Sequence, residues 1–516
     1  MNNIYELEKR ELVPNWRDFE KTLQLGELSM FGNQKVILGN QHISNNIIID
    51  DWHNNKTIGH AADLINNLYT INNLDIPEVN EAIDFIEQNK QYASESLLRL
   101  IKHIKQEKNP QENNTLSTNS TQNIEELRSI TDPNLLNSII KNTKTTTRNY
   151  DRNAITWIEL ARLYTIKGLF NKAEKCILIA LHLAPNNRFV LRSATRFFIH
   201  IKDSEKAIYY LKKATNISND PWLISAHIAT SKIINRYSPF INKGKAVISS
   251  KKFSNYDLTE LASSLGTLEL EHGSFKKSKP FIDLSILTPN DNSLAQFEWL
   301  SKKESRLSFN SLQFEDVKNP FEAFAFKNYS KANFDSALSN CIDWFLDIPY
   351  SKRPLALGSY LATMTGNYEV AVLLCNIGIM IDNREVIFIN NLIYNYCLNH
   401  DLEKAEILIA KYFKDDLIRN ASNEEKITIS ATLGLFYIRT KRVEEGKSIY
   451  KSSIENATKI NNQYYYNLAI INLTRELYLI KDIEYDHYYN ILNNIETTDV
   501  DIIYQLQKVK KLLSNK

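Results

Sequence analysis

The residue types that could bind a metal ion are gathered in one short segment near the N-terminus. In the sequence IDDWHNNKTIGH, carboxylates and imidazoles lie close together, and both are ligands of divalent cations. Polar loops commonly contain the same residue types, so we expect neither a metal site nor a cofactor. Trp16 and Trp52 are expected to pack this segment onto the first helices. The residues that carry the carboxylates and imidazoles are Asp50, Asp51, His53 and His60.

Residues for nucleophilic or phosphate chemistry do not occur in the patterns that such chemistry needs. The sequence contains no GxxxxGK[ST], GxSxG or HExxH motif, and no GxGxxG between a strand and a helix. The cysteines are widely spaced without a CxxC pair, which indicates neither a zinc site nor a disulfide framework. We therefore predict that the protein is not an enzyme; an enzyme acting through the N-terminal segment is the alternative. The cysteines are Cys176, Cys341, Cys375 and Cys397, and we expect Cys341 and Cys375 to be small buried residues.

The composition restricts the elements that position these residues. Only 13 of 516 residues are glycine and 12 are proline, which argues against folds made of many short strands and tight turns. The net charge of +2 provides no overall field for nucleic acid or for an anionic membrane. The sequence shows no secretory leader and no membrane-spanning stretch, so we expect a cytoplasmic protein. Abundant Asn, Ile and Lys are typical of an AT-rich bacterial genome.

An internal period of 34 residues runs through the middle of the chain. Ala337, Ala371 and Ala405 follow one another at this spacing, as do Ala173 and Ala207. Such phasing predicts repeated helix pairs in which small residues lie where two helices meet. The first repeat carries the fullest pattern, with Trp157, Leu160, Ala161, Tyr164, Gly168, Ala173, Ala180 and Pro185.

This pattern resembles the tetratricopeptide repeat, with Ile177 in place of the usual aromatic residue. The resemblance implies an all-α fold, a right-handed α-solenoid of about seven or eight helix pairs. Less regular copies extend the array over residues 154–460. Glycines are expected at the turns within pairs (Gly168, Gly273 and Gly366) and at tight helix contacts (Gly266 and Gly434).

The segments that flank the array have a different character. In residues 1–58 we expect an irregular segment, with short strands at KVILG and NIIID and a helix in NWRDFEKTLQLGEL. The following residues up to 105 have a helical pattern, and an almost purely polar stretch after them indicates a linker. The expected organisation is an N-terminal region (1–105, with helices in 59–105), a linker (106–125), a lead-in helix (126–153), the array (154–460) and capping helices (461–516).

In tetratricopeptide arrays the first helix of each pair lines the concave surface, so the resemblance implies which residues face a partner. The early repeats are basic and apolar at these positions, and the later ones are aromatic. Such a groove suits a peptide or helix of another protein with acidic and apolar anchors. The predicted groove residues are Arg162, Arg192, Arg196, His200, Glu322, Phe326, Tyr329, Arg353, Tyr360, Asn390 and Tyr394.

The function that the resemblance implies is a non-enzymatic scaffold or adaptor for protein–protein interaction. Chaperone-binding members of the family clamp a terminal carboxylate with a set of Lys and Asn residues. This sequence does not match that set, so chaperone C-termini are not predicted ligands. One alternative is a regulatory subunit of a bacterial stress or phage-defence system, with the N-terminal region as effector. A weaker alternative is nucleic-acid binding through Arg162, Arg192, Arg196 and His200. The Tyr464–Tyr466 run is a candidate surface for a homodimer.

Overall fold

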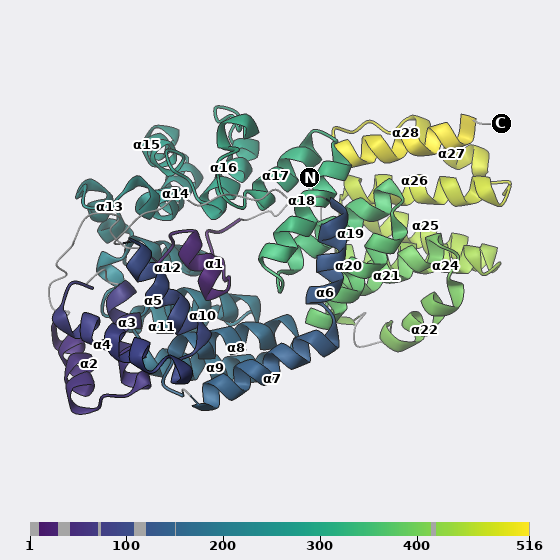
Figure 1. Cartoon of the computed structure of the whole chain (residues 1–516). Helices are drawn as coiled ribbons and strands as arrows, with labels where there is room; N and C mark the ends of the chain where they lie inside the picture. Colours follow the sequence, from purple (N-terminus) through teal and green to yellow (C-terminus); the bar gives the residue numbers. More distant parts are fainter. Residues whose placement is uncertain are drawn as a thin grey trace. The chain divides into compact units, whose positions relative to one another are not determined.

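The computed structural model describes residues 10–28, 42–70, 74–107, 120–149, 151–413 and 419–514. The chain forms two compact units. The N-terminal unit comprises Arg10–Ala323 and Leu346–Tyr350, and the C-terminal unit comprises Phe324–Phe345 and Ser351–Lys516. All regular elements of the described residues are helices, so the prediction of an all-α fold is confirmed (Figure 1).

The N-terminal unit contains an irregular group of helices followed by a regular array. Its elements are α1 (Phe19–Gln24), α2 (His42–Asn54), α3 (Ile58–Thr70), α4 (Pro77–Gln88), η1 (Lys90–Tyr92), α5 (Glu95–Glu107), α6 (Ser120–Ile130), α7 (Pro133–Asn149), α8 (Ala154–Ile166), α9 (Phe170–Leu183), α10 (Arg188–His200), α11 (Ser204–Lys213), η2 (Ile217–Asn219), α12 (Pro221–Ile233), α13 (Ile241–Ser249), α14 (Asn255–Glu271), α15 (Phe275–Ser285), α16 (Asp291–Lys303) and η3 (Ser311–Phe314).

The C-terminal unit continues the pattern of helix pairs. Two helices, α17 (Phe321–Ser330) and α18 (Phe334–Asp347), have most of their residues in this unit. The others are α19 (Lys352–Thr365), α20 (Tyr368–Ile381), α21 (Val386–Leu398), α22 (Leu402–Tyr412), α24 (Asn423–Arg439), α25 (Val443–Lys459), α26 (Gln463–Leu479), α27 (Tyr485–Asn493) and α28 (Val500–Ser514).

Polar side chains start the inner helices of the N-terminal unit. Asn153 caps α8 by accepting from the backbone N–H groups of Ile155 and Thr156, and Asn187 caps α10 from the same repeat position. Asp220, Ser254 and Asn290 cap α12, α14 and α16 in the same way. Each cap satisfies amide groups that a helix start leaves without a partner. The inner helices α8, α10, α12, α14 and α16 therefore begin at regular intervals, and each packs against the next.

The turn within each pair places one residue in the left-handed region. The glycines predicted for these turns are confirmed there, with φ of 69° at Gly168, 78° at Gly273 and 89° at Gly366. Other pairs use residues with a side chain at the same place, so glycine marks only some of the turns. In the described part of the chain, nine pairs share this turn, at Gly168, Lys202, Asn235, Gly273, Ala332, Gly366, His400, Lys441 and Lys481.

Small residues allow the two helices of a pair to approach closely. A Cβ atom on Gly434 would lie 2.5 Å from Tyr450 Cδ2, and one on Gly446 would lie 2.7 Å from the Gly434 carbonyl oxygen. The predicted tight contact is thus confirmed for α24 and α25. The alanines at the repeat's small positions are fully buried, namely Ala161, Ala173, Ala180, Ala337, Ala371 and Ala405.

The N-terminal flank differs from its prediction. The NIIID sequence lies inside α2 and is helical, so the expected strand is wrong, while KVILG lies outside the described residues. Within NWRDFEKTLQLGEL only α1 is helical. Residues 120–125, expected in the linker, belong to α6, and the expected lead-in helix consists of the end of α6 together with α7. Five of the six residues 120–125 are polar, which gives this stretch the composition of a linker.

The four cysteines lie in the core. Each is buried, and burial raises the pKa of the Cys375 thiol to about 12. The prediction that Cys341 and Cys375 are buried core residues is confirmed. Among the described helices, none is both long and apolar enough to cross a membrane.

Candidate functional site

Residues 10–28, which we call the strap, lie along the inner helices of the N-terminal unit. The strap runs from Arg10 through α1 to Leu28, and its apolar side chains are buried. Trp16 is 1% exposed and packs with its ring centroid 5.4 Å from Tyr350 and 6.3 Å from Phe197. Trp16 therefore does not anchor the metal-like segment as predicted, whereas Trp52 packs on Phe85 of α4 as expected.

Side chains of the inner helices bind the backbone of the strap. The Asn292 amide donates to the Val13 carbonyl at 3.1 Å, and the Gln296 amide donates to the Arg10 carbonyl at 3.1 Å. This pattern is the one by which a groove holds an extended peptide, because backbone groups are the part that every peptide shares. Other carbonyls of the strap accept from Lys318, Tyr256 and Arg188; these carbonyls belong to Gln24, Leu25, Glu27 and Leu28.

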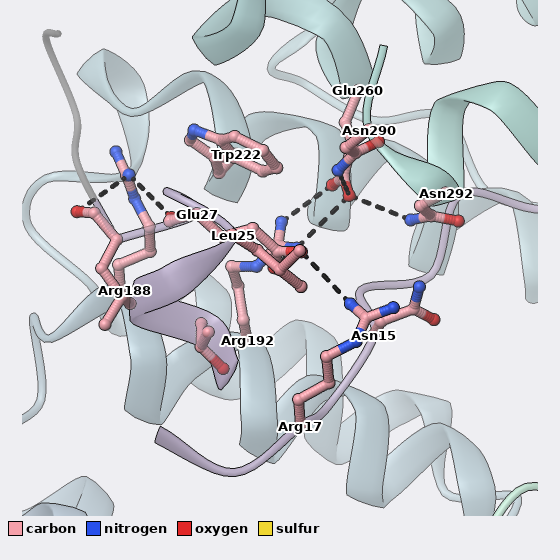
Figure 2. Close-up of polar contacts among 12 residues, drawn as sticks. Asn15, Arg17, Leu25, Glu27, Arg188, Arg192, Trp222, Glu260, Asn290 and Asn292 are labelled. Carbon is pink, nitrogen blue, oxygen red and sulfur yellow. Dashed lines mark hydrogen bonds and ion pairs between the residues drawn. The ribbon is translucent and has the colours of Figure 1, made fainter. Parts of the chain in front are cut away.

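A buried network of charges joins the strap to the inner helices (Figure 2). Arg17 donates from Nε to both carboxylate oxygens of Asp347, at 2.9 and 2.8 Å, and also pairs with Asp291. Arg10 pairs with Glu322 at 2.9 Å. Arginine suits such sites because its planar fork forms two parallel hydrogen bonds with one carboxylate. The strap is thus attached through charge as well as through apolar burial.

Arg192 connects the two ends of this network. Its guanidinium lies between Glu27 of the strap, at 3.1 Å, and Glu260 of α14, at 2.8 Å. Its Cζ atom lies 4.7 Å from the centroid of the Trp222 ring. Two amides, from Asn290 and Asn292, donate to Glu260 at 3.0 Å. Burial opposes ionisation of Glu260, but Arg192 and these hydrogen bonds lower its pKa below the usual value.

Glu27 behaves differently from Glu260. Burial raises the pKa of Glu27 to about 7, although Arg192 and Arg17 act in the opposite direction. The nearby carboxylates of Asp291 and Glu260 add to the increase. Glu260 has two amide donors besides Arg192, and these favour its charged form. Glu27 is therefore the carboxyl of the strap that titrates close to neutral pH.

We predict that Glu27 makes the stability of the N-terminal unit depend on pH. A carboxyl with a raised pKa favours the folded state at low pH, and this contribution is lost as the pH rises from about 4.5 to about 7. The wild-type free energy of unfolding should therefore fall by ~1–3 kcal/mol relative to Glu27→Gln between about pH 5 and pH 8. Urea unfolding of both proteins across this range measures the difference, and parallel pH profiles would contradict the prediction.

The structure places five predicted groove residues in the N-terminal unit, where the strap occupies the inner surface. Arg192 and Glu322 are buried against the strap, so neither lines an open groove. Arg162 pairs with Glu159 at 3.5 Å and lies 4.0 Å from Asp18 of the strap. Arg196 and His200 pack against Tyr350. The Arg196 Cζ atom lies 5.8 Å from the centroid of the Tyr350 ring, and the ring centroids of His200 and Tyr350 are 5.4 Å apart.

Several residues of this surface were not predicted from the sequence. No local pattern separates Glu260 and Gln296 from the other polar residues of α14 and α16. Both are buried, which a solvent-facing residue would not be. Residues that contact the strap but were not predicted include Glu159, Arg188, Lys232, Tyr256, Asp291, Asn292, Gln296, Lys318 and Asp347.

The C-terminal unit contains a cavity of about 990 Å³ on its inner helices α19, α21, α24 and α26 and on α28. Predicted groove residues Tyr360, Asn390 and Tyr394 line it. The other three predicted residues of this unit lie outside the cavity lining. Phe326 and Arg353 pack on Trp344, and Tyr329 packs on Phe334.

Two buried polar groups of the cavity have no hydrogen-bond partner within the described residues. They are Oδ1 of Asn390, whose residue is 7% exposed, and the hydroxyl of Tyr465, which is 3% exposed. Two other tyrosine hydroxyls of the lining have partners. Tyr360 donates to Asp501 at 2.6 Å, and Tyr394 donates to Asn472 at 2.8 Å. The lining therefore contains an acceptor and a hydroxyl whose hydrogen-bonding capacity the described residues do not use.

One side of the cavity is rich in cations. Arg439 forms two bonds with Glu476, at 2.6 and 3.0 Å, and Arg475 donates to the same carboxylate at 2.9 Å. Arg475 also donates to the Tyr394 hydroxyl at 3.4 Å. Lys508 donates to the Met364 carbonyl at 2.9 Å. In total, five cationic residues and two glutamates line the cavity: Arg439, Lys441, Arg475, Lys508 and Lys511 with Glu425 and Glu476.

The residues with metal-binding side chains do not converge. His53 lies 3.5 Å from Glu78, and His60 forms a hydrogen bond of 2.7 Å with Thr57. Within the described residues, no group of three or more His, Cys, Asp or Glu side chains is arranged to hold a metal ion. The tyrosine run proposed for a homodimer also differs from expectation, because Tyr464 and Tyr465 are buried in the core.

Comparisons with known proteins give limited results. No family model matches the sequence, and no curated protein matches it. Yeast Tom70 is similar in structure, with 12% identity, a TM-score of 0.27 and coverage of 76% of this chain and 96% of that one. The APC/C hetero-tetramer Cut9–Hcn1 is similar with 11% identity, a TM-score of 0.35 and coverage of 91% and 96%.

At these TM-scores neither similarity carries an assignment of function. The tetratricopeptide-like organisation rests instead on the 34-residue period of the chain and on its helix pairs. Within each unit these pairs form an α-solenoid, in which each inner helix packs on the next. The described residues therefore define a helical-repeat protein with one filled and one open inner surface.

Proposed function

We propose that the protein is an interaction scaffold or adaptor whose C-terminal cavity binds an extended segment of another protein. The observation that carries this proposal is the strap. In the N-terminal unit, side chains of the inner helices donate to strap carbonyls, and pockets between the helices enclose Trp16 and Leu12. An inner surface of this chain thus holds a peptide-like segment of the same chain.

The cavity of the C-terminal unit offers the same chemistry without such an occupant among the described residues. It lies on the inner helices, and its volume of about 990 Å³ is at the upper end of the range for ligand sites. Asn390 Oδ1 is suited to accept from a backbone N–H, and the Tyr465 hydroxyl is suited to donate to a carbonyl. These two groups support a polypeptide as the ligand.

The alternative of a separate N-terminal effector is not favoured. Arg152, just before α8, pairs with Asp63 of α3 at 3.2 Å. The Asn153 amide donates to Ser94 at 2.8 Å, and the Asn187 amide donates to the Asn66 carbonyl at 2.8 Å. These buried contacts join α3 and the start of α5 to the array, so the N-terminal helices act as its first layer.

The proposal is tested by filling the cavity. Ala431 lies on α24 in the cavity lining, and Ala431→Trp places a large side chain in the space that a peptide would occupy. Peptides selected from a random display library on the full-length protein should lose at least about tenfold in affinity for this variant. Fluorescence polarisation measures the affinity.

A matched control adds the same side chain elsewhere. Ile407→Trp changes an exposed residue of α22, which is 66% exposed and does not line the cavity. This control should retain the affinity of the wild type. The proposed function would be overturned if the selection recovers no specific peptide. It would also be overturned if the selected peptides bind Ala431→Trp as tightly as they bind the wild type.

A further inference from the structure

The cation-rich side of the C-terminal cavity has more positive charge than the protein itself compensates. Arg439 and Arg475 share one carboxylate, Glu476, which is fully buried. Lys508 contacts only a backbone carbonyl among the interactions given above, and Lys441 adds another cation to the lining. Glu425 is the other acidic residue of the lining, and its carboxylate caps α24 by accepting from the Ser422 backbone N–H.

The electrostatics of Lys508 agree with this surplus. Partial burial and the neighbouring charge of Arg475 lower the pKa of Lys508 below its usual value. Among the described residues, no carboxylate raises the pKa of Lys508. A bound anion would favour the charged forms of both side chains, since opposite charges in a partly desolvated site attract strongly.

The lining of the cavity also includes exposed apolar side chains. Leu479 and Ile480, at the end of α26, are 47% and 38% exposed, and Leu512 of α28 is 39% exposed. Exposed apolar side chains gathered at the mouth of a cavity indicate a surface that a ligand covers. The ligand therefore combines an anionic group with an apolar residue.

We infer that the partner segment carries a group with two negative charges, which lies against Arg439, Arg475 and Lys508, next to an apolar side chain at the mouth of the cavity. This inference rests on the proposed function. Three cations against Glu476 leave two positive charges for the ligand to neutralise. Two adjacent acidic side chains and one phosphorylated side chain share this chemistry.

The test uses three synthetic peptides built on a sequence recovered by the display selection. The three peptides differ at one site only. The first has an Asp–Glu pair at this site, the second has phosphoserine in place of the pair, and the third has the neutral Asn–Gln pair. At least one anionic peptide should bind the full-length protein about tenfold more tightly than the neutral peptide, and this difference should shrink as salt is added. The tighter of the two anionic peptides identifies the source of the charge.

Lys508→Gln provides the matched variant, with Lys510→Gln on the same helix as control. Lys510 is exposed and does not line the cavity. Lys508→Gln should weaken the anionic peptide about fivefold and leave the neutral one unchanged, while Lys510→Gln should change neither. One outcome would overturn this inference but retain the proposed function. In it, all three peptides bind the wild type equally well, and all three lose their affinity for Ala431→Trp. Failure to recover any cavity-dependent peptide would overturn both.

Discussion

Replacing Trp16 by alanine is expected to destabilise the N-terminal unit by ~3–5 kcal/mol, because it removes a large buried side chain and leaves a cavity. Trp16 is 1% exposed and packs on Phe197 of α10 and on Tyr350. The loss should also release the strap, which contains Arg17 in a buried and protected position. Trypsin should therefore cut the variant after Arg17 under conditions in which the wild type is resistant.

Unfolding of this unit can be followed by its own fluorescence. Five of the six tryptophans of the chain belong to the N-terminal unit, and Trp344 belongs to the C-terminal unit. Trp157→Ala is the control, since Trp157 is partly exposed on α8. This replacement should lower the free energy of unfolding by less than Trp16→Ala does. If Trp16→Ala unfolds like the wild type and stays resistant to trypsin after Arg17, burial of Trp16 does not hold the strap against the inner helices.

Replacing Arg192 by methionine is expected to destabilise the same unit by ~3–5 kcal/mol, since it leaves the buried carboxylate of Glu260 without its cation. The Arg192 guanidinium lies between Glu27 and Glu260, and all three side chains are at most 4% exposed. Methionine has a similar length and no charge, so the change removes the ion pairs with little loss of volume. Urea unfolding followed by tryptophan fluorescence measures the effect.

An exposed arginine provides the matched control for Arg192. Arg236 pairs with Glu205 at 2.7 Å, and the two side chains are 61% and 59% exposed. Arg236→Met should cost less than about 1 kcal/mol, because exposed ion pairs are screened by water and salt. Similar costs for the two replacements would mean that the buried network contributes no more than a surface pair.

The array could be predicted because its signals are local. Alanine at a fixed spacing and glycine at turns reflect contacts between residues that are close in sequence. These contacts recur along the array, so that Ala173 occupies the same place in its pair as Ala371 and Ala405 do in theirs. Elements without the repeat were harder to predict. NIIID has the composition of a strand, yet it lies in α2, since tertiary contacts override weak intrinsic preferences.

The candidate site could be predicted only in part. Tyr360, Asn390 and Tyr394 were identified from repeat positions, and the structure brings them together in one cavity. Arg439, Arg475 and Lys508 were missed, because they lie in less regular repeats and beyond the last one. No repeat position indicates that a lysine of α28 lines the same cavity as a tyrosine of α19.

The amino-acid sequence by itself determined the helix pairs, their period and their small-residue contacts, because these depend on neighbours within one or two repeats. The tertiary structure alone decided which inner surface is open. Arg17 pairs with Asp347 across 330 residues, and Arg192 pairs with Glu27 across 165. No local pattern encodes such distant pairs. Arg192, one of the basic residues predicted to bind another protein, pairs with the chain's own strap, and the open cavity lies in the C-terminal unit.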